Sequence, residues 1–182
     1  DARFEKAKTI NVPSFKYVRK WLEDNIPADS KTCLIHNDWR FDNVILDPNH
    51  PTQIIGVLDW EMATLGDPLM DLGSALAYWV EESDSALFKA TRRQPTNLKG
   101  MFTRKEVVDY YLEKTGLEVE NWTFYEVFGI FRLAVIAQQI YYRYHHKQTN
   151  NPAFKDFWIL IHALHIRALK SVSYTHLTLP TI

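Results

Sequence analysis

The sequence predicts a mainly α-helical α+β fold in which a small β-hairpin carries the functional residues. Apolar side chains recur at helical spacing in residues 14–26 and again, over longer stretches, after residue 103. Short apolar runs at 32–35, 43–46 and 53–58 predict three strands. The Asp-Pro-Asn-His-Pro sequence at 47–51 is rich in turn formers and predicts a hairpin between the last two strands.

The first helices have recognisable start signals. Pro13 stands near the start of the helix predicted over residues 14–26. Asp67 followed by Pro68 is typical of an N-cap and a first helical position, and predicts a helix that runs to about residue 80.

The later helices are marked by capping boxes. Thr103 with Glu106 opens a predicted helix that ends before Gly116. Thr123 with Glu126 is a second such pair and predicts a long helix to about residue 146. Residues 153–171 form the last predicted helix.

The segments between these elements are less regular. We expect residues 1–11 to be frayed and residues 61–66 to be a plain connector. Residues 81–100 are polar and predict a short helix from Ser83 and then a mobile loop, either solvated or facing a substrate. Residues 173–182 are threonine-rich without a helical pattern, so we expect a disordered or artefactual tail on a domain of residues 1–172.

Composition excludes several classes of protein. Among the 182 residues, 46% are apolar and 14% aromatic, which is enough for a packed core. A net charge of −1 argues against a nucleic-acid partner, and no apolar stretch reaches the ~20 residues that span a membrane. The single Cys33 excludes an internal disulfide and favours a reducing compartment, the cytoplasm or an organelle matrix.

Four side chains in the strand region form a spaced motif. His36-x-Asp38 is followed by Asn43, and Asp59 stands sixteen residues later at the end of the third strand. This spacing is typical of a phosphoryl-transfer loop followed by a metal-binding aspartate. The carboxylate of Asp38 would take or orient a hydroxyl proton, while Asn43 and Asp59 would hold Mg²⁺ against nucleotide phosphates. The hairpin predicts that Asp59 returns beside the loop.

Two longer segments carry a family resemblance. IHNDWRFDNVILD (35–47) and VLDWEMATLGDPLMDLG (57–73) resemble the aminoglycoside phosphotransferase family, a small-molecule branch of the protein-kinase-like fold. The match is most similar to the subgroup fused to, or encoded beside, acyl-CoA dehydrogenases. It covers roughly residues 10 to 170 and implies the C-terminal lobe of that fold.

The resemblance implies roles for individual residues. Asp38 matches the catalytic aspartate, and Asn43 and Asp59 match the Mg²⁺ ligands, with ATP as co-substrate. His36 and Asp71 match residues that support the loop. The family usually has glycine at the position of Asn37, so we expect a slightly altered turn there.

Other residues are candidates of lower rank. Asp67 is interpreted mainly as an N-cap that supports the site. Arg40 either meets a phosphate or pairs with Asp42 or Glu61, and the sequence does not decide between them. The resemblance also implies that Glu61, Trp79 and Glu81 contact the acceptor.

One departure from the family concerns the nucleotide. The first glycine of the chain is Gly56, and only 35 residues precede His36. There is no room for a glycine-rich phosphate loop, so we expect the N-terminal lobe to be missing and this chain alone to be inactive.

The resemblance implies an ATP- and Mg²⁺-dependent kinase that acts on a small-molecule hydroxyl. The form Asp59-Trp-Glu-x₄-Gly-Asp-Pro68 resembles the dehydrogenase-linked subgroup, which implies a hydroxyacyl-CoA or hydroxy acid and an acyl-CoA dehydrogenase as fusion or working partner. The alternatives are an aminoglycoside or choline-like amino alcohol as acceptor, or an inactive binding module. A protein kinase is disfavoured because no Asp-Phe-Gly follows the loop.

Overall fold

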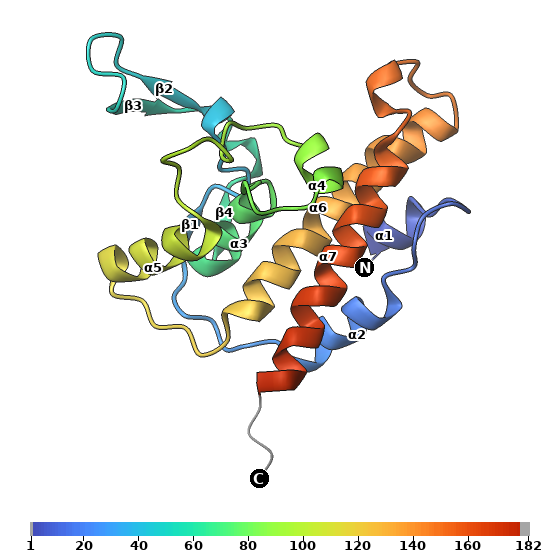
Figure 1. Ribbon diagram of the computed structural model, residues 1–182, viewed down its shortest axis with the longest axis horizontal. Helices are drawn as coiled ribbons and strands as arrows, with labels where there is room; N and C mark the ends of the chain where they lie inside the picture. The colour runs from blue at the N-terminus through green and yellow to red at the C-terminus, as the bar shows by residue number, and fades with distance from the viewer. Residues whose placement is uncertain (1, 179–182) are drawn as a thin grey trace. The chain divides into compact units, whose positions relative to one another are not determined.

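The computed structural model describes residues 2–178 of the chain (Figure 1). The chain forms two compact units, one from the segment up to Pro27 together with the segment from Trp122 onward, the other from Ala28–Asn121. Helices dominate both, and the two small sheets are antiparallel. The predicted α+β, mainly helical class is therefore confirmed, and the whole phosphoryl-transfer motif lies in the second unit.

The first unit is built on two long helices, α6 (Trp122–His145) and α7 (Phe157–Thr178), which pack along each other (Figure 1). The turn between them contains the 3₁₀ helix η3 (Pro152–Phe154), whose first free N–H group is capped by Asn151. Two short helices, α1 (Ala2–Lys6) and α2 (Lys16–Asp24), pack against this pair.

Three phenylalanines hold the N-terminal segment to this helix pair. The rings of Phe4, Phe15 and Phe131 lie 5.6–5.7 Å apart, and the first two are fully buried. Burial of such a ring contributes roughly 1.5–3 kcal/mol, which offsets the strained left-handed backbone of Phe15 (φ 51°). The expectation of a frayed start is thus wrong, because Phe4 supplies a buried anchor.

The second unit contains both sheets. Strand β2 (Val44–Leu46) pairs with β3 (Ile54–Val57) as the predicted hairpin, which extends away from the rest of the unit (Figure 1). Strand β1 (Cys33–Ile35) pairs with β4 (Thr64–Gly66), although 61–66 was expected to be a connector. At Gly66 a Cβ atom would lie 2.8 Å from Ile35 Cδ1, so a larger residue there would force the end of the Ile35 side chain to shift.

The helices of this unit follow their predicted caps. Helix α3 (Pro68–Ala77) packs on β1, and the Asp67 carboxylate at its start accepts a 2.8 Å hydrogen bond from the N–H of Leu69. Helix α5 (Arg104–Thr115) begins with the predicted capping box. It ends at Gly116, which adopts the left-handed conformation (φ 68°) that suits glycine.

Three predicted boundaries shift. Helix α6 begins at Trp122, so Thr123 lies inside it and Asn121, an equally good cap residue, precedes it. Helix α7 begins at Phe157 rather than 153, because the chain first makes the η3 turn at Pro152. It continues to Thr178, which makes the first part of the expected disordered tail helical; residues 179–182 lie outside the described residues.

The segment 81–100 also differs from the prediction. The short helix α4 (Ala86–Ala90) starts after Ser85, whose side chain caps it, rather than at Ser83. Gln94 and Thr96 are buried, which is unlike a solvated loop. Among residues 2–178, no helix is long and apolar enough to cross a bilayer.

The first unit should lose stability in mild acid. Burial, together with the nearby His162, holds the pKa of His165 below its ordinary value of 6.5. The unfolded chain therefore takes up the proton first, and stability falls as the pH drops from 6.5 towards the lowered pKa. We expect His165→Gln to lose less thermal stability than the wild type between pH 7.5 and 5.5. His146→Gln, at an exposed position, serves as the control and should track the wild type; equal acid sensitivity of all three proteins would contradict this assignment.

Candidate active site

The β2–β3 hairpin brings the ends of the motif together. Val44 pairs with Val57, and the N–H of Leu58 donates a 2.8 Å hydrogen bond to the carbonyl of Asn43. Asp59 directly follows Leu58, so the pairing of β2 with β3 places its backbone beside Asn43, the last residue of the motif loop (residues 36–43).

Asp38 and Asn43 are in direct contact. Asn43 Nδ2 donates to the backbone carbonyl of Asp38 at 2.8 Å and lies 3.4 Å from its Oδ2. The Asn43 side chain is buried, with 6% of the residue exposed. Because the amide nitrogen is turned to Asp38, Oδ1 is the atom left to face a ligand, and no other side chain or backbone group within residues 2–178 bonds to it.

Asp59 turns the chain sharply after β3. It adopts the left-handed conformation (φ 66°, ψ 44°) and leads into the 3₁₀ helix η2 (Trp60–Met62). Non-glycine residues in this region store strain and gather at functional sites, although aspartate tolerates it better than most. Its side chain is exposed, and its carboxylate has no hydrogen-bond or ion-pair partner in the described part of the chain.

These two side chains suit a hard cation. The Asn43 amide oxygen and the Asp59 carboxylate are oxygen donors of the kind that Mg²⁺ prefers. Mg²⁺ commonly takes only one or two protein ligands and completes its shell with water and substrate phosphates. Among the described residues, no group of three or more acidic, histidine or cysteine side chains could hold a metal ion.

His36 joins the loop to the strand before Asp59. Its ring is buried; Nε2 lies 2.7 Å from the carbonyl of Leu58, and Nδ1 accepts from the N–H of Asp38 at 3.2 Å. Since Nδ1 accepts, the proton must sit on Nε2 and donate to Leu58. One neutral imidazole thus connects Asp38 to the residue before Asp59.

Asp71 anchors the start of the loop from helix α3. Its two carboxylate oxygens accept from the N–H groups of His36 (2.8 Å) and Asn37 (2.9 Å). Asn37 adopts the left-handed conformation (φ 65°), which glycine takes without strain, and its side chain donates to the carbonyl of Met62 at 3.1 Å. The turn therefore keeps a glycine-like backbone with asparagine in place.

Arg40 is held by acids on its own loop. Its guanidinium lies 3.2 Å from Asp38 and 3.6 Å from Asp42, and stacks over Tyr78 with its carbon 5.4 Å from the ring centre. Pairing with Asp42 was one of the open alternatives, whereas the contact with Asp38 was not foreseen. Glu61 lies exposed in η2 and makes no hydrogen bond or ion pair within the described residues.

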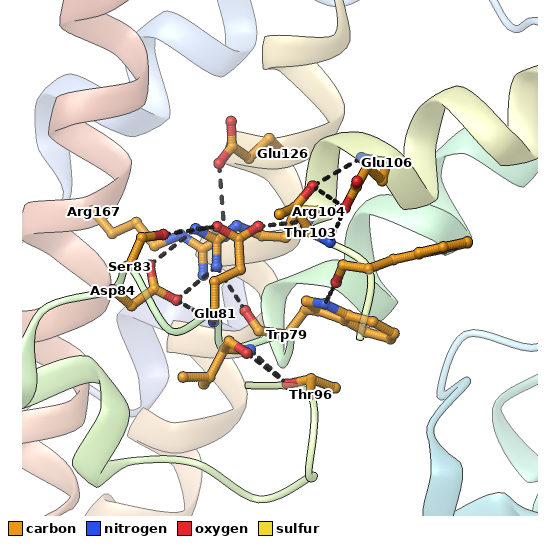
Figure 2. A network of polar contacts seen from close by, with 12 residues as sticks. Trp79, Glu81, Ser83, Asp84, Thr96, Thr103, Arg104, Glu106, Glu126 and Arg167 are labelled. Carbon is orange, nitrogen blue, oxygen red and sulfur yellow. Dashed lines mark hydrogen bonds and ion pairs between the residues drawn. The ribbon is translucent and has the colours of Figure 1, made fainter. Parts of the chain in front are cut away.

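Trp79 and Glu81 belong to a polar network around Arg104 (Figure 2). The Arg104 guanidinium makes a two-pronged contact with Asp84 (2.8 and 2.9 Å) and lies 3.3 Å from Glu81. It also donates to the carbonyl of Trp79, whose indole N–H donates to the carbonyl of Phe102 at 2.8 Å. The network holds together the segment between α3 and α5. It also pairs the Glu81 carboxylate with Arg104.

A pocket of about 630 Å³ opens beside this network and is lined by residues 81–83 and 96–103. Its other acidic residue, Glu82, pairs with Lys89 at 3.2 Å, and that hydrogen bond keeps the pKa of Glu82 below its usual value. The ring of Trp79 contacts Phe41 of the motif loop, with ring centres 5.5 Å apart. Trp79 also bonds to the carbonyl of Phe102, which lines the pocket, so Trp79 links the pocket lining to the loop.

Sequence reasoning missed two residues of this region. Arg104 was visible only as the first residue after a capping threonine, and its partners lie 20 to 25 positions away. Gln94 bonds to the backbone of Phe41, and nothing in its local sequence marks that contact.

The comparison with protein families settles the membership. The sequence profile described as "Phosphotransferase enzyme family" matches residues 2–106, more than half of the chain. The chain belongs to this phosphotransferase family. Its members are kinase-like enzymes, and the resemblance noted from the two motifs is confirmed.

Two curated relatives extend the comparison. Mouse acyl-CoA dehydrogenase family member 10 is 36% identical over 143 residues, covering 78% of this chain and 13% of that protein. Mouse acyl-CoA dehydrogenase family member 11 is 31% identical over 145 residues, covering 78% of this chain and 18% of that protein. The similarity to dehydrogenase-linked phosphotransferases is therefore confirmed, although the chain spans less than a fifth of either relative.

A solved structure agrees with the fold. A putative aminoglycoside phosphotransferase from Ralstonia eutropha matches 95% of this chain with a TM-score of 0.78 at 24% identity. The chain spans 53% of that protein, so the helix-rich architecture corresponds to about half of a kinase-like phosphotransferase.

The Asp71 contacts predict a local loss of order in a variant. In Asp71→Asn the amide offers one acceptor oxygen in place of two, so one of the two loop N–H groups loses its partner. We expect a loss of about 1–3 kcal/mol in unfolding free energy and faster amide exchange at His36 and Asn37. Asp109→Asn, which removes only an exposed pair with Lys105, should change stability by less than about 0.5 kcal/mol; equal effects of the two variants would contradict the anchoring role.

Proposed function

We propose that this chain is the acceptor-side part of an ATP- and Mg²⁺-dependent kinase that phosphorylates a hydroxyl group of a small molecule. The observation that carries the proposal is the joint placement of Asp38, Asn43 and Asp59 around the β2–β3 hairpin. Family membership supports phosphoryl transfer, and the contacts around the motif loop support the individual roles.

Asp38 acts on the acceptor hydroxyl. Its carboxylate accepts the hydroxyl proton as the oxygen attacks the γ-phosphorus, the new P–O bond forms, and the bond to ADP breaks. The chain does little covalent chemistry of its own, so its contribution is alignment of the reacting groups. The N–H of Asp38 bonded to His36 and the Asn43 amide bonded to its carbonyl both serve that alignment.

Asn43 and Asp59 would hold the metal through oxygen atoms. When bound, Mg²⁺ neutralises negative charge on the transferring phosphates. Arg40 lies beside Asp38 and offers a second positive charge next to the reacting groups. Arg40 already pairs with the carboxylates of Asp38 and Asp42. We therefore propose that its main role is to position the Asp38 carboxylate, and that contact with a phosphate is its second role.

The charges around the pocket favour an acceptor that is not cationic. Glu81 is engaged by Arg104, and Glu82 is engaged by Lys89. A cationic amino alcohol or aminoglycoside needs unpaired acidic groups, and the pocket offers none among its described lining residues. We therefore propose a hydroxyacyl-CoA or hydroxy acid, in keeping with the dehydrogenase names of the relatives, and keep an amino alcohol as the second candidate.

The nucleotide needs groups that residues 2–178 do not supply. No glycine precedes Gly56, while nucleotide phosphates in kinases are covered by a glycine-rich loop. We propose that a longer protein containing this chain provides that loop, works with or is fused to an acyl-CoA dehydrogenase, and acts in the cytoplasm or an organelle matrix. The 53% coverage of the Ralstonia protein is consistent with such an additional lobe.

An acceptor screen tests this proposal. A protein that joins this chain to a nucleotide-binding lobe is incubated with Mg²⁺, ATP and two acceptor sets, hydroxyacyl-CoA or hydroxy acids and choline-like or aminoglycoside amino alcohols. We expect acceptor-dependent ADP release and a phosphorylated product with the first set. If only the amino alcohols are phosphorylated, the acceptor is an amino alcohol and not a hydroxyacyl compound. If neither set is phosphorylated, the kinase proposal is contradicted.

Asp38→Asn is the matched variant for this screen. It keeps the shape of the side chain and removes its basicity, so we expect turnover to fall by roughly 10²–10⁴-fold with an unchanged thermal unfolding midpoint. Near-normal turnover would remove Asp38 from its role.

A further inference from the structure

Gln94 makes a contact outside the predicted site that bears directly on the motif loop. It is a buried residue, 4% exposed, and its Oε1 accepts a 2.8 Å hydrogen bond from the backbone N–H of Phe41. Gln94 lies 53 positions along the chain from this partner. The bond therefore joins the segment just before the pocket-lining residues 96–103 to the loop that carries Asp38 and Asn43.

The partner of Gln94 is the first residue of a 3₁₀ helix. Helix η1 (Phe41–Asn43) begins after Arg40, whose side chain makes no capping hydrogen bond. The first N–H groups of a helix have no partner inside it and need an acceptor from elsewhere. Gln94 supplies that acceptor, and the turn closes with a 3.0 Å bond from the N–H of Asn43 to the carbonyl of Arg40.

Gln94 is itself held in place. It precedes Pro95, which restricts its backbone to extended conformations. Two residues on, the fully buried Thr96 hydroxyl accepts from the N–H of Val80 at 2.9 Å and donates to its carbonyl at 2.8 Å, just beyond the end of α3 (Figure 2). The acceptor oxygen is thus fixed relative to the helix that also carries Asp71.

We propose that Gln94 is a positioning residue for the phosphoryl-transfer loop. It caps η1 from outside and so sets the orientation of Asn43, whose amide in turn bonds to Asp38. Gln94 touches neither substrate nor metal in this role. Its importance for turnover rests on the proposed kinase function, whereas its effect on loop order does not.

Two substitutions separate the hydrogen bond from the packing. Gln94→Met keeps the length of the side chain and removes the acceptor, while Gln94→Glu keeps an acceptor oxygen at the same reach. We expect Gln94→Met to lower kcat by roughly 10- to 100-fold through misalignment, with the acceptor KM changed by less than about twofold. It should also raise the Mg²⁺ concentration at half-maximal rate, because Asn43 is displaced. Gln94→Glu should stay close to the wild type in both quantities.

Amide exchange provides a readout that needs no activity. We expect the Phe41 and Asn43 amides to exchange faster in Gln94→Met and at the wild-type rate in Gln94→Glu. If the wild type phosphorylates no acceptor, the kinase proposal fails on its own, and the exchange rates alone decide the positioning role.

Val108→Ala is the control for a purely structural effect. Val108 is buried in α5, outside both the motif loop and the pocket lining. The variant should lower the thermal midpoint and leave kcat per folded enzyme and Phe41 exchange unchanged. Gln94→Asn, in which the acceptor oxygen lies one methylene further from Phe41, replaces Gln94→Met if the latter does not fold. The positioning role is overturned if the Gln94 variants behave like Val108→Ala, or if Gln94→Glu is as impaired as Gln94→Met.

Discussion

One neutral imidazole connects the two arms of this site. His36 accepts from the N–H of Asp38 through Nδ1 and reaches the carbonyl of Leu58 through Nε2, one residue before Asp59. Either contact alone would order one arm, but together they hold the backbone of Asp38 and the backbone of Leu58 relative to each other. The ring packs against Trp60, with ring centres 4.8 Å apart, which limits its freedom to turn. Other contacts of the second unit support the residues on either side of this imidazole.

That support has to balance backbone strain at both arms. Asn37 and Asp59 adopt left-handed conformations, which cost about 1–3 kcal/mol each in non-glycine residues. The two hydrogen bonds to Asp71 and those made by His36 contribute about 0.5–1.5 kcal/mol apiece, and more where the carboxylate is the acceptor. The strain is thus offset by polar contacts of the motif loop and of Leu58, the residue before Asp59, and such preorganisation is what an alignment-based phosphoryl transfer needs.

The sequence predicted those elements whose contacts join residues close together along the chain. The Asp67 and Thr103 caps act within three residues of themselves, and the β2–β3 hairpin follows from its turn sequence. The β1–β4 pairing and the Gln94 contact join residues far apart in sequence, so neither hydrophobic periodicity nor turn residues could predict them. Phe4 shows the same limit, since its charged neighbours suggested a frayed end while its ring fills the core. The motif spacing predicted that Asp38, Asn43 and Asp59 lie together, but the supporting roles of His36 and Asp71 could be assigned only through the family resemblance.

In the proposed function, Asn43 and Asp59 share one Mg²⁺ ion beside Asp38. A crystal structure of a longer protein containing this chain, with Mg²⁺ and a non-hydrolysable ATP analogue, would show the ion and its ligands. We expect an ion about 2.0–2.1 Å from Asn43 Oδ1 and from an Asp59 carboxylate oxygen, with its remaining positions filled by phosphate oxygens and water. An ion bound to the nucleotide with either side chain outside its coordination shell would contradict it.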